Sequence, residues 1–190
     1  MDRVLLVTPT KKSADMLLGL LKDGGHFPKH IQIVSSGSEA RRALIDHSFD
    51  LILINSPLPD EFGHEFAAFA SADGSTAVVM LVKSELADSV AEQLEPEGIF
   101  ILAKPLNRLL FYQIIRIAKA ARIHVMNLAR ENQKLRQKLD DMRLISRAKC
   151  LLIQEKHMTE EEAHSYLEKN AMNYRKTRRE VAEIVIQRFE

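Results

Sequence analysis

Five short apolar runs alternate with amphipathic segments through the first 105 residues of the chain. The runs consist largely of Val, Ile and Leu, as is typical of strands buried on both faces of a parallel sheet. The segments between them have apolar residues at helical spacing, which suits crossover helices. We therefore predict an α/β domain with a doubly wound, five-stranded parallel sheet. The expected strands are Val4–Val7, Ile31–Val34, Leu51–Ile54, Ala77–Val82 and Ile99–Leu102, and the expected helices are Ser13–Leu21, Ser38–Ile45, Phe62–Phe69 and Glu85–Leu94.

The segment from Leu109 to about His157 contains neither Gly nor Pro. It predicts one helix much longer than those of ordinary globular domains. Apolar residues follow a heptad pattern through its middle, with a polar Asn132 at a central a position, which favours a two-stranded coiled coil in register. The alternative is a single amphipathic helix packed on its own domain. The residues expected to mediate dimerisation are Val125, Leu128, Asn132, Leu135, Leu139 and Met142.

The C-terminal segment predicts two short helices after the long one. Thr159-x-x-Glu162 is a capping box that starts a helix near Glu160. Asn170–Asn173 has the composition of a break, and the last helix carries apolar residues on one side. Such a three-helix unit is too small to be very stable alone, so we expect the long helix to support it.

Charge divides the chain into two parts. Residues 1–105 hold 9 Lys or Arg and 15 Asp or Glu, a net charge of −6, whereas residues 106–190 hold 18 and 11, a net charge of +7. A basic half can accumulate near nucleic acid through attraction to phosphate. The single cysteine, Cys150, excludes an internal disulfide framework and a Cys-based zinc cluster, and it fits the reducing cytoplasm. No signal peptide or membrane-spanning run is evident, so we expect a cytoplasmic protein.

Residues 1–120 resemble a response-regulator receiver domain of the flavodoxin-like fold. The matching features are the alternating strands, Asp50–Asn55 with Pro57, Pro59 and Gly63 after it, and Lys104-Pro105. In that family an Asp at the end of the third strand accepts a phosphoryl group, and an acidic pair after the first strand holds Mg²⁺. A hydroxyl residue after the fourth strand and a Lys after the fifth contact the phosphoryl oxygens.

This chain departs from the receiver pattern at four of those positions. The acceptor position is Asn55, the acidic-pair positions are Thr8 and Pro9, and the hydroxyl position is Val82, so only Lys104 remains. An amide is a poor nucleophile toward phosphorus, and Mg²⁺ lacks its carboxylate ligands here. We therefore predict a pseudo-receiver with a vestigial site and no bound metal or cofactor.

Lys104 has two interpretations. It either senses a ligand anion in the vestigial pocket or bonds Asn55 and nearby carbonyls, with Pro105 shaping the turn through a possible cis bond. We favour the second. Asp60 and Glu61 are able to coordinate metal, but on a Pro-rich loop we expect them to be solvated.

Residues 143–190 resemble the ANTAR domain. Arg147–Leu152 is similar to that family's Ala-Lys-Gly-Ile-Leu signature, and the helices that follow match its remaining landmarks at Glu161–Ala163, Tyr166–Leu167, Ala171–Met172 and Glu180–Val185. Cys150 replaces the usual Gly, and Arg178 stands where an apolar residue is frequent. The resemblance implies a transcription antiterminator that binds paired RNA hairpins. The order of pseudo-receiver (1–120), coiled-coil helix (109–145) and three-helix ANTAR domain (143–190) also matches the family.

The chemistry of the C-terminal unit suits RNA. Basic residues cluster at the start of the predicted last helix, whose N-terminus favours phosphate, and Tyr174 is placed to stack on an unpaired base. A charge cluster alone is more often a solvated face, and Met172 is expected to pack between helices. Lys149 is the favoured single residue, since it matches the motif. The predicted RNA-binding residues are Arg143, Arg147, Lys149, Tyr174, Arg175, Lys176, Arg178 and Arg179.

The expected function is therefore RNA-binding antitermination on leader hairpins by a homodimer, without catalysis or phosphorylation control. A nucleophile–base pair, a Gly-rich phosphate loop and a His cluster are all missing from the sequence. Two alternatives remain open. In one, the pseudo-receiver is an adaptor for a regulatory protein or ligand; in the other, the chain is a DNA-binding response regulator, although a helix-turn-helix is not evident.

Overall fold

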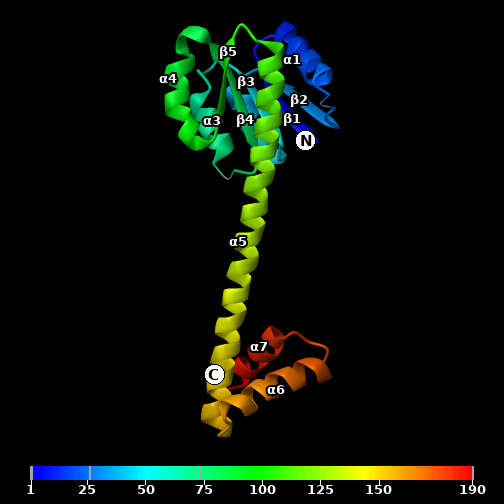
Figure 1. Cartoon of the computed structure of the whole chain (residues 1–190), viewed down its shortest axis with the longest axis vertical. Helices are drawn as coiled ribbons and strands as arrows, with labels where there is room; N and C mark the ends of the chain where they lie inside the picture. Colours follow the sequence, from blue (N-terminus) through cyan, green and yellow to red (C-terminus); the bar gives the residue numbers. More distant parts are fainter. Residues whose placement is uncertain (1, 26, 73, 190) are drawn as a thin grey trace. The chain divides into compact units, whose positions relative to one another are not determined.

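The computed structural model describes residues 2–25, 27–72 and 74–189. The chain divides into two compact units, Met1–Leu128 and Ala129–Glu190. The division falls inside one helix, α5 (Arg108–Lys156), which contributes to both units (Figure 1). The long helix expected from the absence of Gly and Pro is thereby confirmed.

A five-stranded parallel sheet forms the centre of the first unit, with the order β2-β1-β3-β4-β5. All five predicted strands are present. Because the chain leaves β1 toward opposite edges of the sheet, the switch point lies between β1 and β3, where ligands bind in folds of this kind. The strand bounds are β1 Arg3–Val7, β2 His30–Val34, β3 Leu51–Asn55, β4 Ala77–Lys83 and β5 Phe100–Lys104.

The connecting helices also follow the prediction. Their bounds are α1 Lys11–Asp23, α2 Gly37–Asp46, α3 His64–Ser71 and α4 Ser84–Leu94, followed by the 3₁₀ turn η1 Glu95–Glu97. The third helix starts two residues later than Phe62, the expected start. Gly63 precedes it with φ 101°, and a Cβ there would meet Cγ2 of Ile54 at 3.2 Å, so a glycine turn delays the helix.

Helices cover both faces of the sheet. Alternate strand residues pack on α2, α3 and α4 on one face, around the fully buried Phe66. The other residues of the same strands pack on α1 and the first part of α5, around the fully buried Phe111 (Figure 1). Strands β1, β3 and β4 are buried on both faces, which explains why their sequences are continuously apolar, whereas the edge strand β2 is largely exposed.

A partly buried ion pair fixes α5 near the amino-terminal ends of the central strands β3 and β4. Arg122 lies 2.6 Å from Asp50, and its Nε donates to the carbonyl of Ser75. Asp50 also accepts hydrogen bonds from the backbone N–H groups of Asp2 and Arg3. Burial raises the pKa of Asp50, but these bonds and the Arg122 charge outweigh it, so the pKa lies below its ordinary value.

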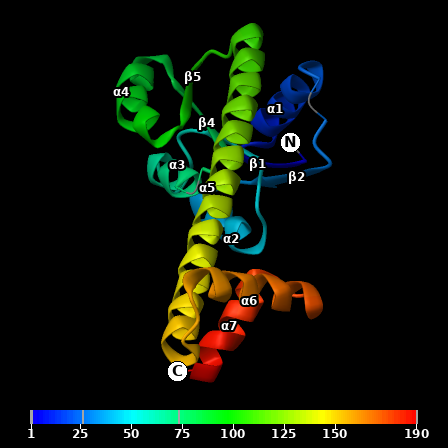
Figure 2. The same cartoon turned by 60° about the horizontal axis from the view of Figure 1, so that its bottom comes forward.

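The second unit consists of the end of α5, α6 (Glu160–Asn173) and α7 (Arg178–Phe189) (Figure 2). The predicted capping box at Thr159 and Glu162 is confirmed, with both reciprocal hydrogen bonds present. The predicted break at Asn170–Asn173 is wrong. These residues complete α6, because their backbone bonds continue the helix while Asn170 donates its side-chain amide to the Tyr166 carbonyl.

A small apolar core holds these three helices together. Several of its members are alanines, which allow the helix backbones to approach closely, so little area is available to stabilise the unit. The buried residues are Ala148, Leu152, Ala163, Leu167, Ala171, Val181, Ala182 and Val185.

Because this core is small, the capping box of α6 should contribute measurably to stability. Substituting Thr159→Ala removes the acceptor for the Glu162 amide and should lower the free energy of opening of α6 by about 1 kcal/mol. Native-state hydrogen exchange of the full chain measures this locally. Lys169→Ala, an exposed change within the same helix, serves as control. Equal protection of α6 in all three proteins would contradict the assignment.

Candidate nucleic-acid interface and vestigial pocket

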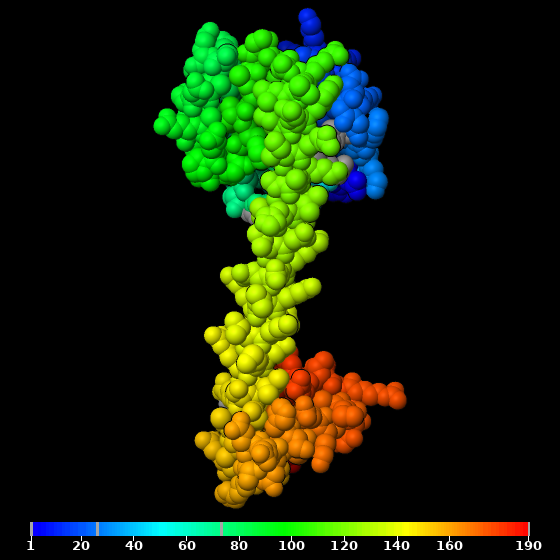
Figure 3. Space-filling view, in the orientation of Figure 1, coloured from blue at the N-terminus to red at the C-terminus, as the bar shows by residue number. Residues whose placement is uncertain are grey.

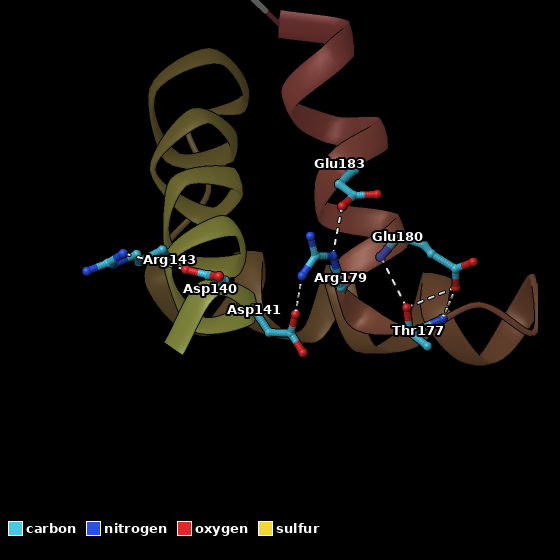
Figure 4. Close-up of polar contacts among 7 residues, drawn as sticks. All are labelled: Asp140, Asp141, Arg143, Thr177, Arg179, Glu180 and Glu183. Atoms are coloured by element: carbon cyan, nitrogen blue, oxygen red, sulfur yellow. Dashed lines mark hydrogen bonds and ion pairs between the residues drawn. The ribbon is translucent and has the colours of Figure 1, made fainter. Parts of the chain in front are cut away.

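Helix α7 begins at a second capping box. Thr177 Oγ1 accepts a hydrogen bond from the Glu180 backbone N–H at 3.2 Å, and Glu180 Oε2 accepts one from the Thr177 backbone N–H at 2.6 Å (Figure 4). The pattern Thr-x-x-Glu is also present in the sequence here, but it was not among the predicted helix starts. The predicted basic cluster at the start of this helix therefore divides: Arg175 and Lys176 lie in the turn before α7, and Arg178 and Arg179 are its first two residues.

Arg179 connects α7 to α5 through two carboxylates. Its guanidinium lies 2.7 Å from Asp141 on α5 and 2.9 Å from Glu183, one turn further along α7 (Figure 4). The hydrogen bonds to Asp141 and Glu183 raise the pKa of Arg179 above its ordinary value. This predicted RNA-binding residue is therefore already engaged within the fold, and neither carboxylate was singled out from the sequence.

Other predicted RNA-binding residues also have acidic neighbours. Lys149 Nζ lies 3.0 Å from Glu160, and its side chain is only 20% exposed. Arg178 lies 3.1 Å from Glu168 on α6. Arg143 has a longer contact of 3.5 Å with Asp140 and points to the opposite side of α5 from Asp141 (Figure 4). Arg147 is exposed on the same helix.

The turn between α6 and α7, Tyr174–Thr177, presents an aromatic ring and two cations to solvent. The Tyr174 side chain is 69% exposed, and Arg175 and Lys176 are exposed as well. Arg175 adopts φ 52°, and the Lys176 backbone N–H donates to the Ala171 carbonyl at 2.9 Å, so the backbone of the turn is defined. In the space-filling view the orange-red turn protrudes from the C-terminal unit (Figure 3).

The expectation that Met172 packs between helices is wrong. Its side chain is 80% exposed, because Ala171 takes the core-facing position beside it. Met172 instead lines a shallow cleft of about 460 Å³ between α6 and α7. We call this feature the α6–α7 cleft, and its lining residues are Glu168, Ala171, Met172, Lys176 and Arg178.

Three positions of the vestigial receiver site, Thr8, Asn55 and Lys104, meet at the switch point of the sheet. Lys104 Nζ donates to Asn55 Oδ1 at 3.1 Å and to the Ser56 carbonyl. The Asn55 amide donates to Thr8 Oγ1 at 3.1 Å, and Thr8 is buried. These contacts agree with the structural interpretation of Lys104. Burial, followed by the charge of Lys83, lowers the pKa of Lys104.

The two remaining positions of that site lie apart from this hydrogen-bonded chain. Pro9 is exposed, and Val82 is completely buried in the sheet. The Lys104–Pro105 peptide bond is cis, as had been considered from the sequence. The site thus links Thr8, Asn55 and Lys104 through neutral amide and hydroxyl groups in the place where a working receiver has carboxylates.

Asp60 and Glu61 are not merely solvated, contrary to expectation. Asp60 accepts hydrogen bonds from the backbone N–H groups of Ser38 and Gly37, both at 2.9 Å, and these bonds lower the pKa of Asp60 to about 2. Glu61 pairs with Arg41 at 2.9 Å. Both carboxylates therefore attach the loop after β3 to the N-terminal turn of α2.

The predicted dimerisation residues form an exposed stripe on α5. Leu128, Leu135, Leu139 and Met142 are between 52% and 65% exposed, and Asn132 is exposed among them. Val125 is 41% exposed and lies beside Gly74, where a Cβ would come within 2.8 Å of its Cγ1. Within the described residues, the apolar side chains of this stripe from Leu128 to Met142 are therefore largely uncovered.

Two general kinds of site are not found in the part of the chain that the structure describes. Residues 2–25, 27–72 and 74–189 contain no group of three or more His, Cys, Asp or Glu side chains placed to hold a metal ion. None of the helices in these ranges combines the length and apolar character needed to cross a membrane.

Two curated relatives are similar over most of the chain. The transcriptional regulatory protein PdtaR of Mycobacterium tuberculosis is 26% identical over 151 residues, covering 80% of this chain and 74% of the relative. The aliphatic amidase regulator of Pseudomonas aeruginosa is 24% identical over 178 residues, covering 91% and 85%. The chain is thus similar to transcriptional regulators along nearly its whole length.

Solved structures match the first unit. The signal receiver domain of an HD domain-containing protein from Pseudomonas fluorescens aligns with a TM-score of 0.57 and 20% identity, covering 66% of this chain and 91% of that one. A CheY-like receiver domain protein from Methanospirillum hungatei aligns with a TM-score of 0.54 and 19% identity, covering 65% and 98%. Residues 133–186 match the sequence profile of the ANTAR domain. The chain therefore carries an ANTAR domain at its C-terminal end, preceded by a domain with the response-regulator receiver fold.

Proposed function

We propose that the protein is an RNA-binding transcription antitermination regulator that holds hairpins of nascent leader RNA. The observation that carries this proposal is the exposed α6–α7 turn within the ANTAR domain. Holding the hairpins would prevent a competing terminator stem from forming, and transcription would continue. The role requires binding and not catalysis, in keeping with relatives that are regulators.

The turn offers the two kinds of contact that single-stranded RNA loops accept. The exposed Tyr174 ring provides a face on which an unpaired base can stack. Arg175 and Lys176 lie next to it and attract phosphate. Lys149, Arg178 and Arg179 are held by carboxylates, so we assign them mainly to supporting the fold and secondarily to RNA.

We further propose that the protein acts as a homodimer through α5. Its exposed leucines at a and d positions match a partner helix in register, and Asn132 favours two strands. A dimer carries two ANTAR domains, so binding of the second hairpin becomes intramolecular. This raises avidity by roughly 10²–10⁴ where the spacing of the hairpins permits.

Phosphorylation does not control the protein in this proposal. Asn55 stands at the acceptor position and already bonds Lys104 and Thr8. Mg²⁺ needs oxygen ligands of high charge, and the acidic-pair positions hold Thr8 and Pro9. A regulatory protein or ligand at the pseudo-receiver is one route for an input signal in this proposal.

Substitutions in the turn should weaken RNA binding in two distinguishable ways. Arg175→Gln and Lys176→Gln should each lower affinity for an RNA with two hairpins and reduce the salt slope by about 1, because each removes a phosphate contact. Tyr174→Ala should cost about 1–3 kcal/mol with little change in slope, because it removes stacking. Fluorescence anisotropy over a range of salt concentrations measures both quantities.

Lys12→Gln, an exposed change on α1 of the receiver-like unit, is the matched control for lost positive charge. It should leave affinity and slope unchanged. Parental affinity in all three turn variants, with the fold intact by circular dichroism, would refute the assignment of the turn. Equal competition by duplex DNA would favour a DNA-binding regulator instead.

The proposed dimer is tested by removing apolar side chains from the exposed stripe of predicted dimerisation residues on α5. Leu135→Ala with Leu139→Ala should shift the protein to monomers, at a cost of about 2 kcal/mol or more for each buried leucine. Gln137→Ala, an exposed change on the same stretch of α5, should not. Sedimentation equilibrium gives the dissociation constants. A parent protein that is monomeric at micromolar concentration would rule out a stable coiled-coil dimer.

Treatment with acetyl phosphate and Mg²⁺ should produce no phosphorylated protein. The chemical reason is that neither the nucleophilic carboxylate nor the metal ligands are present at the receiver site. Intact-protein mass spectrometry provides the readout, with a receiver that retains its acidic residues treated in parallel. A stoichiometric phosphoryl adduct on the first unit would contradict the proposal.

A further inference from the structure

Glu168 is an acidic side chain in an otherwise cationic neighbourhood. It lines the α6–α7 cleft together with Lys176 and Arg178, next to the protruding turn. A carboxylate repels phosphate, so this position is unfavourable for the RNA backbone. It is favourable for a base edge that donates hydrogen bonds, because an ionised carboxylate is an acceptor only.

The carboxylate of Glu168, which lines the cleft, can accept hydrogen bonds beyond those it already makes. Within the described residues, its ion pair with Arg178 at 3.1 Å and its contact with His164 Nε2 at 3.4 Å both involve Oε1. A carboxylate has about four acceptor positions, so Oε2 and part of Oε1 can still accept. Arg178 meanwhile fixes the orientation of the carboxylate, which reduces the entropy lost when a ligand binds.

The cleft also has an apolar wall. Met172, 80% exposed, and the Ala171 side chain lie on the side that α6 contributes. A thioether makes favourable contacts with aromatic rings, as a nucleobase presents. The cleft of about 460 Å³ is shallow and open, which fits a flat base extruded from a loop better than a compact ion.

We propose that the α6–α7 cleft is a base-recognition site that selects guanine in the loop of the bound hairpin, with Glu168 as the residue that determines specificity. The proposal rests on the RNA-binding function proposed above. Guanine presents two neighbouring donors on its Watson–Crick edge, N1–H and the 2-amino group, which match the two oxygens of one carboxylate. Adenine and cytosine offer a single amino donor on that edge, and uracil a single imino donor.

In this arrangement the neighbouring residues have separate roles. Met172 packs against the face of the base, and Lys176 neutralises the adjoining phosphate. Arg178 positions Glu168 without contacting the base. Removing the carboxylate should therefore change which loop is preferred, whereas removing Lys176 should weaken all loops equally.

The test uses the full chain and a hairpin library with one constant stem and a fully randomised loop. Bound RNA is recovered and sequenced for the parent protein, Glu168→Gln, Arg178→Gln and Glu161→Gln. Glu161 is exposed on the first turn of α6 and does not line the cleft, so its substitution controls for lost negative charge. Thermal unfolding checks that each variant is folded.

The parent and Glu161→Gln proteins should enrich guanine at one loop position, and Glu168→Gln should lose this enrichment while still binding hairpins. Replacing that guanine by inosine, which lacks the 2-amino group, should weaken the parent about tenfold and leave Glu168→Gln unchanged. Arg178→Gln should retain a weaker guanine preference, because the carboxylate is still present but is no longer held in one orientation. Unchanged enrichment in Glu168→Gln, or equal loss in Arg178→Gln, would overturn the proposal. Failure of the parent to bind any hairpin would instead refute the proposed function.

Discussion

Two hydrophobic cores depend on one uninterrupted helix. Near its start, α5 places Phe111, Ile115 and Ala118 against the sheet of the receiver-like unit. Near its end, it places Ala148 and Leu152 against α6 and α7. Without Gly or Pro the helix has no residue at which it would readily break or kink. The stretch between the two cores keeps its apolar a and d side chains exposed, and this is the surface we assign to a second copy.

In the ANTAR domain, charged and polar side chains mainly connect its helices to one another, and these contacts position the residues that face solvent. Its core is rich in alanine, and ion pairs and capping boxes connect the same helices. Arg179 joins α7 to Asp141 of α5, and Thr177 with Glu180 fixes where α7 begins. These contacts hold the turn at Tyr174 outward. The positive residues of the domain accordingly divide into those that build the fold and those that face solvent.

Much of the fold was predictable from sequence, and less of the site. Val4–Val7 and the other continuous apolar runs gave the correct strands, and Thr159-x-x-Glu162 gave the correct start of α6. The absence of a carboxylate at Asn55 was also evident from residue type alone. The break expected at Asn170–Asn173 failed because a local polar composition was outweighed by helix hydrogen bonding.

The exposure of Met172 and the pairing of Arg179 with Asp141 were beyond sequence reasoning for a different reason. Both depend on how α6 and α7 pack, since Asp141 is separated from Arg179 by 38 residues. The contacts of Asp60 and Glu61 were also not predictable from the sequence, because their partners in α2 lie far away along the chain. Charge patterns indicate which residues are available for binding, but tertiary contacts decide which of them are already occupied.

Crosslinking of the protein to RNA in cells tests the central claim most directly. Ultraviolet crosslinking followed by peptide mapping and sequencing of the recovered RNA identifies both sides of the contact. We predict crosslinks on the peptide that contains Met172, Tyr174 and Arg175, and recovered fragments that fold into hairpins upstream of coding regions. Crosslinks confined to the receiver-like unit, or no enrichment of RNA over a control protein, would contradict the assignment of this ANTAR domain as an RNA reader.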